Sequence, residues 1–308
     1  MPIELLMFVR EASGSVPPRP DDRMRDDELP YVAMIAGTLE GGFRTATIRQ
    51  MIRAQSDGLR RIAETEAITW QSDVIQPAMQ RGMRADEALG IEFGDRMAVL
   101  TEQAVIAMYH LQQARAWSAG IIDGVEQQLA AAGLHRRLEH PPAMCFLDIT
   151  GYTRLTQERG DAAAAQLAEE LGGIVRQTAV HHGGQPVKWL GDGVMLHFRE
   201  PAGVVASALA MVRRVPEAGL PPAHVGVAAG PVVVQGGDYF GRTVNLASRV
   251  AAHARGGQVL VTDAVAAVAA PDGVAYRDLG ELQLKGFTAP VRVLEARPAR
   301  PQPQARLR

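Results

Sequence analysis

The spacing of hydrophobic positions divides the chain into two parts. Over residues 31–132 apolar side chains recur at intervals of three and four residues, and no strand-like alternation interrupts them. This spacing places apolar residues along one face of a helix. It predicts helices over Thr45–Trp70, Asp86–Arg115 and Ala116–Ala132, and hence an all-α N-terminal domain.

A different pattern begins at Ala143, where short apolar runs alternate with amphipathic segments. The Gly191-Asp192-Gly193 run is a strong signal for a tight hairpin. Hairpins mixed with helices indicate the α+β class. We predict helices over 160–182, 201–214 and 243–254, and strands over 143–149, 185–190, 194–198, 224–229, 231–235, 258–262, 274–284 and 290–296.

Polar and proline-rich stretches set the predicted domain limits. Residues 11–30 are rich in Pro, Asp and Arg, and residues 133–142 close on two prolines. We predict a flexible leader over 1–30, a helical regulatory or dimerisation domain over 31–132, a linker over 133–142, a second domain over 143–296 and a disordered tail over 297–308.

Composition excludes several classes of protein. The net charge of −2 gives no basic field for nucleic acid, and no run of about 20 apolar residues predicts a membrane span. The single cysteine, Cys145, excludes an internal disulfide and fits a reducing compartment. It lies in an apolar run, which favours a buried side chain over a nucleophile. We expect a cytoplasmic protein.

Two aspartates stand at the predicted ends of strands. Asp148 nearly closes the run 143–149, and Asp192 occupies the hairpin turn. If the strands are neighbours, the two carboxylates converge beside free backbone N–H groups. Such hard oxygen ligands suit Mg²⁺ or Mn²⁺, and the N–H groups suit phosphate. The structural alternative is an Asx-type turn at Asp192 and a strand cap at Asp148.

Lys188 and Asp238 offer a donor and an acceptor to a purine base. An ammonium satisfies N1 of adenine and a carboxylate accepts from its amino group, whereas guanine presents the opposite polarity. Within the predicted helix 243–254, Asn245 and Arg249 lie four residues apart on one face. An amide and a guanidinium there suit a ribose and a phosphate under attack. Taken singly, each of these residues also fits an ordinary exposed position.

Four segments together resemble the catalytic domain of the class III adenylate and guanylate cyclases. They occur in the order typical of that family and extend over about half of the chain. The segments are Phe146-Leu-Asp-Ile-Thr-Gly-Tyr-Thr153, Val187-Lys-Trp-Leu-Gly-Asp-Gly193, Asp238-Tyr-Phe-Gly-Arg-Thr-Val-Asn-Leu-Ala-Ser-Arg249 and Leu284-Lys-Gly286.

The resemblance implies a role for each candidate residue. Two divalent cations, Mg²⁺ or Mn²⁺, would be held by Asp148, Asp192 and the Ile149 carbonyl. Lys188 and Asp238 would read adenine, and Lys285 would hold the terminal phosphates of ATP. Asn245 would orient the ribose and Arg249 would stabilise the transition state.

The same resemblance implies a ferredoxin-like βαββαβ core that works as a head-to-tail homodimer. The metal carboxylates of each site would come from one protomer and the base-reading and transition-state residues from the other. The helical region 31–132 resembles the regulatory domains of some bacterial cyclases, with an unknown signal. The family often carries Arg at the start of one strand, where this chain has His224.

Three other functions are alternatives to an adenylate cyclase. A guanylate cyclase would contradict the Lys188/Asp238 polarity, and a non-catalytic nucleotide-binding module would not require Asn245 and Arg249 together. Gly236-Gly-Asp-Tyr-Phe240 is similar to the diguanylate cyclase signature, but Tyr239 stands where that signature needs a second acid.

Overall fold

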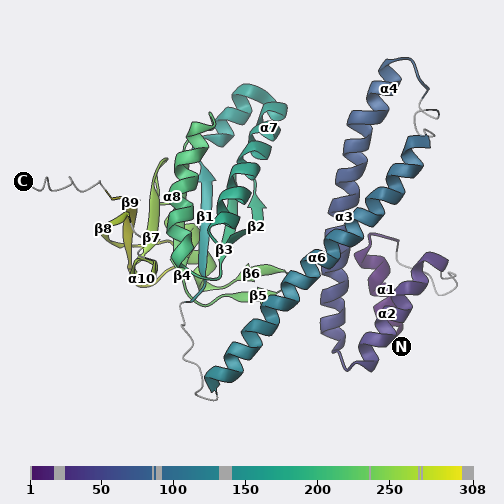
Figure 1. Cartoon of the computed structure of the whole chain (residues 1–308), viewed down its shortest axis with the longest axis horizontal. Coiled ribbons are helices and arrows are strands. Elements are labelled where there is room, and N and C mark those ends of the chain that lie inside the picture. The colour runs from purple at the N-terminus through teal and green to yellow at the C-terminus, as the bar shows by residue number, and fades with distance from the viewer. Residues whose placement is uncertain are drawn as a thin grey trace, which may run out of the picture. The chain divides into compact units, whose positions relative to one another are not determined.

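The computed structural model describes residues 2–16, 25–84, 87, 92–131, 141–235, 237–269, 271 and 273–299. It forms two compact units, Met1–Leu138 and Glu139–Arg308 (Figure 1). Residues 133–140 of the predicted linker and residues 300–308 of the predicted tail lie outside the described residues.

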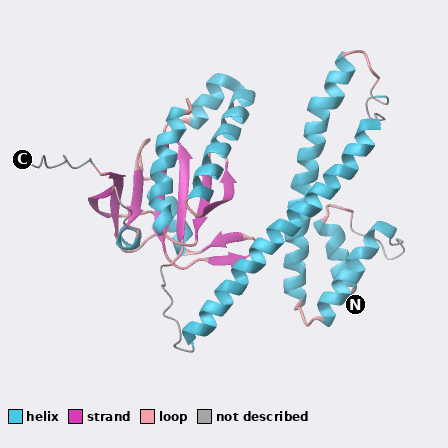
Figure 2. Cartoon of the chain, in the orientation of Figure 1, coloured by secondary structure: helices cyan, strands magenta, loops and turns pink. Residues whose placement is uncertain are grey.

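The described residues of the first unit form helices joined by turns and loops, and they contain no strand (Figure 2). Its small core joins α1, α2 and α3 through Leu5, Phe8, Val9, Ile35, Ile48 and Ile52. The elements are α1 (Ile3–Ala12), η1 (Asp26–Glu28), α2 (Leu29–Glu40), α3 (Thr45–Trp70), η2 (Gln71–Ile75), α4 (Gln76–Gln80) and α6 (Glu92–Ala131).

The prediction of a flexible leader is wrong for Ile3–Ala12, which forms α1. Leu5, Phe8 and Val9 share one helix face and are buried, so this segment contributes to the core. The Arg10 guanidinium also donates to the Glu28 carboxylate at 2.6 Å, which ties α1 to η1. That ion pair holds the pKa of Glu28 down at about 2.

The predicted break between residues 115 and 116 is also wrong. A single helix, α6, runs from Glu92 to Ala131. The residues around the junction are mostly Ala and Gln, strong helix formers, and neither Pro nor Gly stands at 115 or 116. None of the described helices is long and apolar enough to cross a membrane.

The second unit contains a seven-stranded sheet with the order β2-β3-β1-β4-β7-β9-β8, in which β4 and β7 are parallel. Its elements are β1 (Ala143–Ile149), α7 (Tyr152–His181), β2 (Gly184–Leu190), β3 (Gly193–Phe198), α8 (Ala202–Glu217), β4 (Ala223–Ala229), β5 (Val233–Gln235), β6 (Asp238–Phe240), α9 (Arg242–Ala251), β7 (Val259–Thr262), α10 (Asp263–Val268), β8 (Val274–Leu282) and β9 (Val291–Pro298).

The first six of these elements form the predicted βαββαβ core. β1 pairs antiparallel with both β3 and β4, and β3 pairs with β2. The α+β class and the all-α N-terminal region are therefore confirmed. Several details differ. Strand β6 and helix α10 were not predicted. Strand β9 extends to Pro298, into the predicted tail, and α7 begins at Tyr152 but breaks at Gly160, where φ is 79° and ψ 171°.

Residues alternate along β1 between the two faces of the sheet. Cys145, Leu147 and Ile149 face the main core, which includes buried residues of α7 and α8, and those helices cover this face in Figure 1. Met144 and Phe146 pack in another cluster with Ala247 of α9. Asp148 is two residues after Phe146 and therefore lies on the same face of the sheet as Met144 and Phe146. This face, opposite the one that α7 and α8 cover, is called the α9 face below.

Cys145 is free and fully buried, as predicted. Burial raises the pKa of its thiol to about 12, which keeps the thiol protonated and inert at neutral pH.

Helix α9 lies directly against the central strands because Gly226 of β4 has no side chain. A Cβ at Gly226 would stand 2.0 Å from the Ala251 nitrogen and 2.6 Å from the Ala247 carbonyl oxygen. Both contacts are with backbone atoms, which cannot rotate away. The residue at position 226 therefore fixes how closely α9 approaches the sheet.

We predict that Gly226→Ala lowers the free energy of unfolding by about 1–3 kcal/mol or more, as overpacking of a core does. Urea denaturation of the full chain measures the change. The matched control is Gly173→Ala in α7, where a Cβ meets nothing within 4 Å. That change should leave stability unchanged or raise it slightly. Equal effects of the two substitutions would contradict the close packing of α9.

Candidate active site

The two predicted metal ligands lie at one end of the central strands. Asp148 pairs across the sheet with Gly193 on β3 and with His224 on β4. Asp192 lies in the β2–β3 turn, next to Gly193. Strands β1 and β3 are neighbours, which is the condition for the predicted convergence of the two carboxylates. The β2–β3 turn brings Asp192 to the same end of the sheet as Asp148.

The charges at this end disfavour two free carboxylates. Burial raises the pKa of the Asp148 carboxyl, the negative charge of Asp192 raises it further, and His224 opposes the rise. The His224 Nε2 atom lies 3.9 Å from the Asp148 Oδ2 atom. The Ile149 N–H donates to Asp148 Oδ1 at 2.9 Å, which fixes the orientation of the carboxylate.

These residues fit a divalent cation that substrate would help to coordinate. A cation between Asp148 and Asp192 would relieve their repulsion, and carboxylate oxygens are the ligands that Mg²⁺ prefers. In the described part of the chain no group of three or more His, Cys, Asp or Glu side chains could hold a metal ion.

Lys188 and Asp238 form a direct ion pair, with 2.7 Å between Nζ and Oδ2. Lys188 pairs with Met195 across β2 and β3, and Met195 packs in the cluster of the α9 face. The Lys188 ammonium lowers the pKa of the Asp238 carboxyl, so the carboxylate stays ionised. Both side chains remain accessible, with exposed fractions of 52% and 26%.

Asn245 and Arg249 lie on exposed positions of α9, one helical turn apart. The opposite side of this helix is buried through Thr243, Ala247, Val250 and Ala251. Lys285 is exposed in the turn after β8, and its neighbour Leu284 packs against Val250. The packing of α9 and of Leu284 thus places Asn245, Arg249 and Lys285 on one side of the unit.

The structure brings some of the predicted residues together and leaves others apart. Lys188 forms an ion pair with Asp238, and the negative charge of Asp192 raises the pKa of the Asp148 carboxyl. No described contact joins Asn245, Arg249 or Lys285 to either pair. Sequence reasoning missed His197, whose ring stacks on Tyr239 with 4.5 Å between the ring centroids. Both residues were present in the sequence, but their pairing depends on contacts between distant segments.

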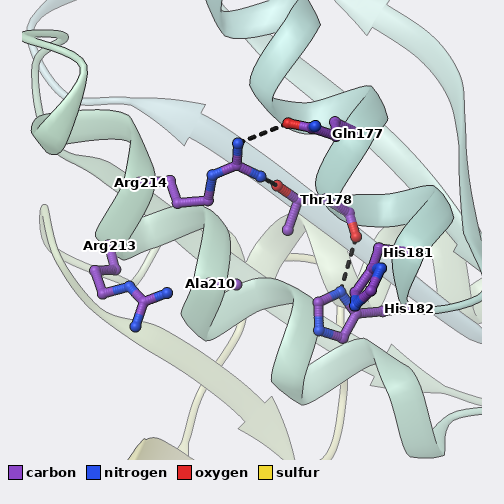
Figure 3. Close-up of a pocket in the computed structure, with 7 residues that line it drawn as sticks. All are labelled: Gln177, Thr178, His181, His182, Ala210, Arg213 and Arg214. Carbon is purple, nitrogen blue, oxygen red and sulfur yellow. Dashed lines mark hydrogen bonds between the residues drawn. The ribbon is translucent and has the colours of Figure 1, made fainter.

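A pocket of about 450 Å³ lies elsewhere, between α7 and α8 (Figure 3). Arg214 of α8 donates there to the Thr178 hydroxyl at 2.8 Å and to the Gln177 side-chain oxygen at 2.7 Å of α7. These bonds join the two helices. The pocket contains none of the predicted site residues, so it gives no support to the catalytic assignment.

Comparisons with known proteins identify the family to which the second unit is similar. Residues 138–295 match the family model of the adenylate and guanylate cyclase catalytic domain. The chain is 29% identical over 311 residues to a pH-sensitive adenylate cyclase of Mycobacterium tuberculosis, covering 96% of this chain and 75% of that protein. It is 31% identical over 237 residues to an adenylate cyclase of Streptomyces coelicolor, covering 75% of this chain and 59% of that protein.

An uncharacterized protein of Mycobacterium tuberculosis is 30% identical over 254 residues, which cover 80% of this chain and 62% of that protein. The crystal structure of the adenylyl cyclase CyaB from P. aeruginosa matches 53% of this chain and 96% of its own, with 24% identity and a TM-score of 0.47. The chain belongs to the adenylate and guanylate cyclase catalytic domain family, which confirms the class III resemblance.

We predict that the contribution of the Asp148 carboxyl to the stability of the metal-free protein falls as pH rises. Because the pKa of Asp148 is raised in the folded state, that state binds protons more tightly than the unfolded chain does. The stability loss begins near the ordinary value of 3.8 and is complete above the raised value. Asp148→Asn should therefore raise the midpoint of thermal unfolding at neutral pH, and Glu158→Gln, an exposed acid on α7, should not.

The same measurement with Mn²⁺ tests the metal site. At 100 times its Kd, a bound ion should stabilise the wild-type chain by about 2.7 kcal/mol. Asp148→Asn should lose most of this gain and Glu158→Gln should keep it. Equal stabilisation of all three proteins would place the metal elsewhere.

Proposed function

We propose that this chain is an adenylate cyclase that converts ATP to 3′,5′-cyclic AMP and pyrophosphate. The observation that carries the proposal is the 2.7 Å Lys188–Asp238 pair, which lies on the same sheet face as the Asp148 carboxylate. It offers a purine-reading pair and a metal-type carboxylate site within one fold. The names of the relatives support the same reaction.

Lys188 and Asp238 would select adenine. In the free protein each satisfies the other, so the pair is held in place before nucleotide binds. Adenine would insert its N1 acceptor toward the ammonium and its amino group toward the carboxylate. Guanine would meet both groups with the wrong polarity, which disfavours a guanylate cyclase.

Asp148, Asp192 and the Ile149 carbonyl would hold two divalent cations, Mg²⁺ or Mn²⁺. When bound, such ions neutralise triphosphate charge and lower the pKa of the ribose 3′-hydroxyl. In the reaction, the 3′-oxygen forms a bond to the α-phosphorus, the bond to the pyrophosphate oxygen breaks, and the hydroxyl proton leaves to water or phosphate.

The remaining site residues would orient the substrate and stabilise charge. Asn245 would position the ribose from α9. Arg249, one turn later, would stabilise the charge that develops on the α-phosphoryl oxygens. Lys285 would hold the terminal phosphates, which become the leaving pyrophosphate.

We place this site between the two protomers of a homodimer. Exposed apolar side chains lie on and beside the elements that carry Lys188 and Asp238: Trp189, Leu190, Val233, Val234 and Phe240 are 39–61% exposed. An apolar surface of this kind is typical of a protein interface. One protomer would supply Asp148 and Asp192, and its partner Lys188, Asp238, Asn245 and Arg249.

We also assign regulation to the N-terminal helical unit, with an unknown signal. It has a core of its own, separate from that of the sheet, so it can change without unfolding the catalytic unit. Identical activity and responses of the chain with and without residues 1–138 would contradict this role.

We propose the cytoplasm as the compartment of this protein. Its single cysteine, Cys145, is buried and free, which fits a reducing environment.

We predict that the purified full chain forms cyclic AMP and pyrophosphate from ATP with Mn²⁺ or Mg²⁺. Arg249→Ala should reduce kcat by about 10²–10³-fold, because one preorganised contact to the transition state is lost. The matched control is Arg213→Ala on α8, an exposed arginine on the other face of the sheet, which should keep wild-type activity.

A parallel assay with GTP tests the choice of base. Efficient formation of cyclic GMP would mean that the Lys188–Asp238 argument is wrong and that the chain is a guanylate cyclase. Nucleotide binding without either product, under both metals, would favour the non-catalytic signalling module.

A further inference from the structure

The Asp238 carboxylate is held from two sides. Its Oδ2 atom accepts from Lys188, and its Oδ1 atom accepts from the Tyr239 backbone N–H at 2.9 Å. Both oxygens are therefore oriented by protein donors. The position of the carboxylate depends on the backbone at Tyr239 as much as on Lys188.

That backbone belongs to a small separate ribbon. Within the described part of the chain, β5 and β6 pair only with each other, through Val233–Phe240, Val234–Tyr239 and Gln235–Asp238, and form a two-stranded sheet outside the seven-stranded one. Ribbons of two strands are marginally stable alone. The contacts that join this ribbon to the main sheet therefore decide where Asp238 lies.

One described contact of that kind is aromatic. The Tyr239 ring stacks on the His197 imidazole of β3, with ring centroids 4.5 Å apart and planes inclined by 29°. Tyr239 is also packed against the cluster formed by Met144, Met195, Ala228 and Ala247. Stacked aromatic pairs are worth about 0.5–1.5 kcal/mol beyond the area they bury.

The surroundings of His197 favour a neutral ring that stacks. His197 lies across the sheet from Met144 on one side and Gln185 on the other. Burial lowers the pKa of its imidazole, so the uncharged form dominates at neutral pH. Burial likewise raises the pKa of the Tyr239 phenol, against an opposing hydrogen bond with Gln185.

We propose that His197 and Tyr239 are positioning residues that set the preference for adenine over guanine. Their stack fixes the β5–β6 ribbon on β3 and so holds Asp238 at the place where it meets the amino group of the base. This inference rests on the proposed function. The stack itself touches no reacting atom, so it should affect recognition of the base and leave the chemical step intact.

The test compares removal of the stack with its replacement. Tyr239→Ala and His197→Ala remove one ring, whereas Tyr239→Phe and His197→Phe keep an aromatic pair. For each full-length variant, kcat and KM are measured with ATP and with GTP, together with Kd for non-cyclisable analogues of both. His181→Ala, at the exposed end of α7, is the matched control.

The alanine variants should reduce the ATP-to-GTP ratio of kcat/KM by about 10-fold, the upper range for a stacked pair. The change should lie in KM and in Kd, with kcat nearly constant, since damage to the fold as a whole would lower kcat too. Both phenylalanine variants and His181→Ala should retain the wild-type ratio.

Two results would overturn the inference. One is an unchanged ATP-to-GTP ratio of Kd in the alanine variants. The other is a loss in the phenylalanine variants as large as that in the alanine variants, because the stack would then be irrelevant. Absence of cyclic AMP from the wild-type chain would overturn the proposed reaction, and the Kd ratios would still decide the role of the stack.

Discussion

The close contact between α9 and β4 at Gly226 is the constraint on which the candidate site depends. A backbone-to-backbone approach of this kind leaves no room for a Cβ, so the helix lies at a fixed depth on the sheet. Asn245 and Arg249 are carried by the outer side of that helix, and Leu284 packs against its Val250. The packing at Gly226 thus determines the positions of Asn245 and Arg249 and, through Leu284, that of its neighbour Lys285.

The two faces of the sheet have different roles: one contributes most of the hydrophobic core, and the other carries the candidate site. One face is covered by α7 and α8 and contains most of the buried side chains. The α9 face combines smaller apolar clusters with the ionisable groups. Asp148 and Asp192 repel each other there, whereas Lys188 and Asp238 attract. Asp148 and Asp192 are therefore suited to bind a cation. Lys188 and Asp238 are suited to bind a purine base, whose polar groups can replace the contact of each residue with the other.

Much of this arrangement could be predicted because its signals are local. The alternation along β1 places Asp148 away from the main core, and the Gly-Asp-Gly turn places Asp192 at the same strand end. Helix α3 could be predicted from its spacing alone. The leader was mispredicted because proline-rich composition over residues 11–30 was extended to Ile3–Ala12, whose apolar face packs on α2 and α3. The separate β5–β6 ribbon and the His197–Tyr239 stack could not be predicted, since both depend on contacts between segments that the sequence does not place together.

The arrangement of the site between two protomers is tested most directly by mixing two inactive variants. Asp148→Ala lacks a metal carboxylate and Arg249→Ala lacks the transition-state cation, so each homodimer should be inactive. A heterodimer would keep one intact site, and random pairing of equal amounts should restore about a quarter of wild-type cyclic AMP formation. No recovery, in a mixture where heterodimers are confirmed to form, would contradict the shared site.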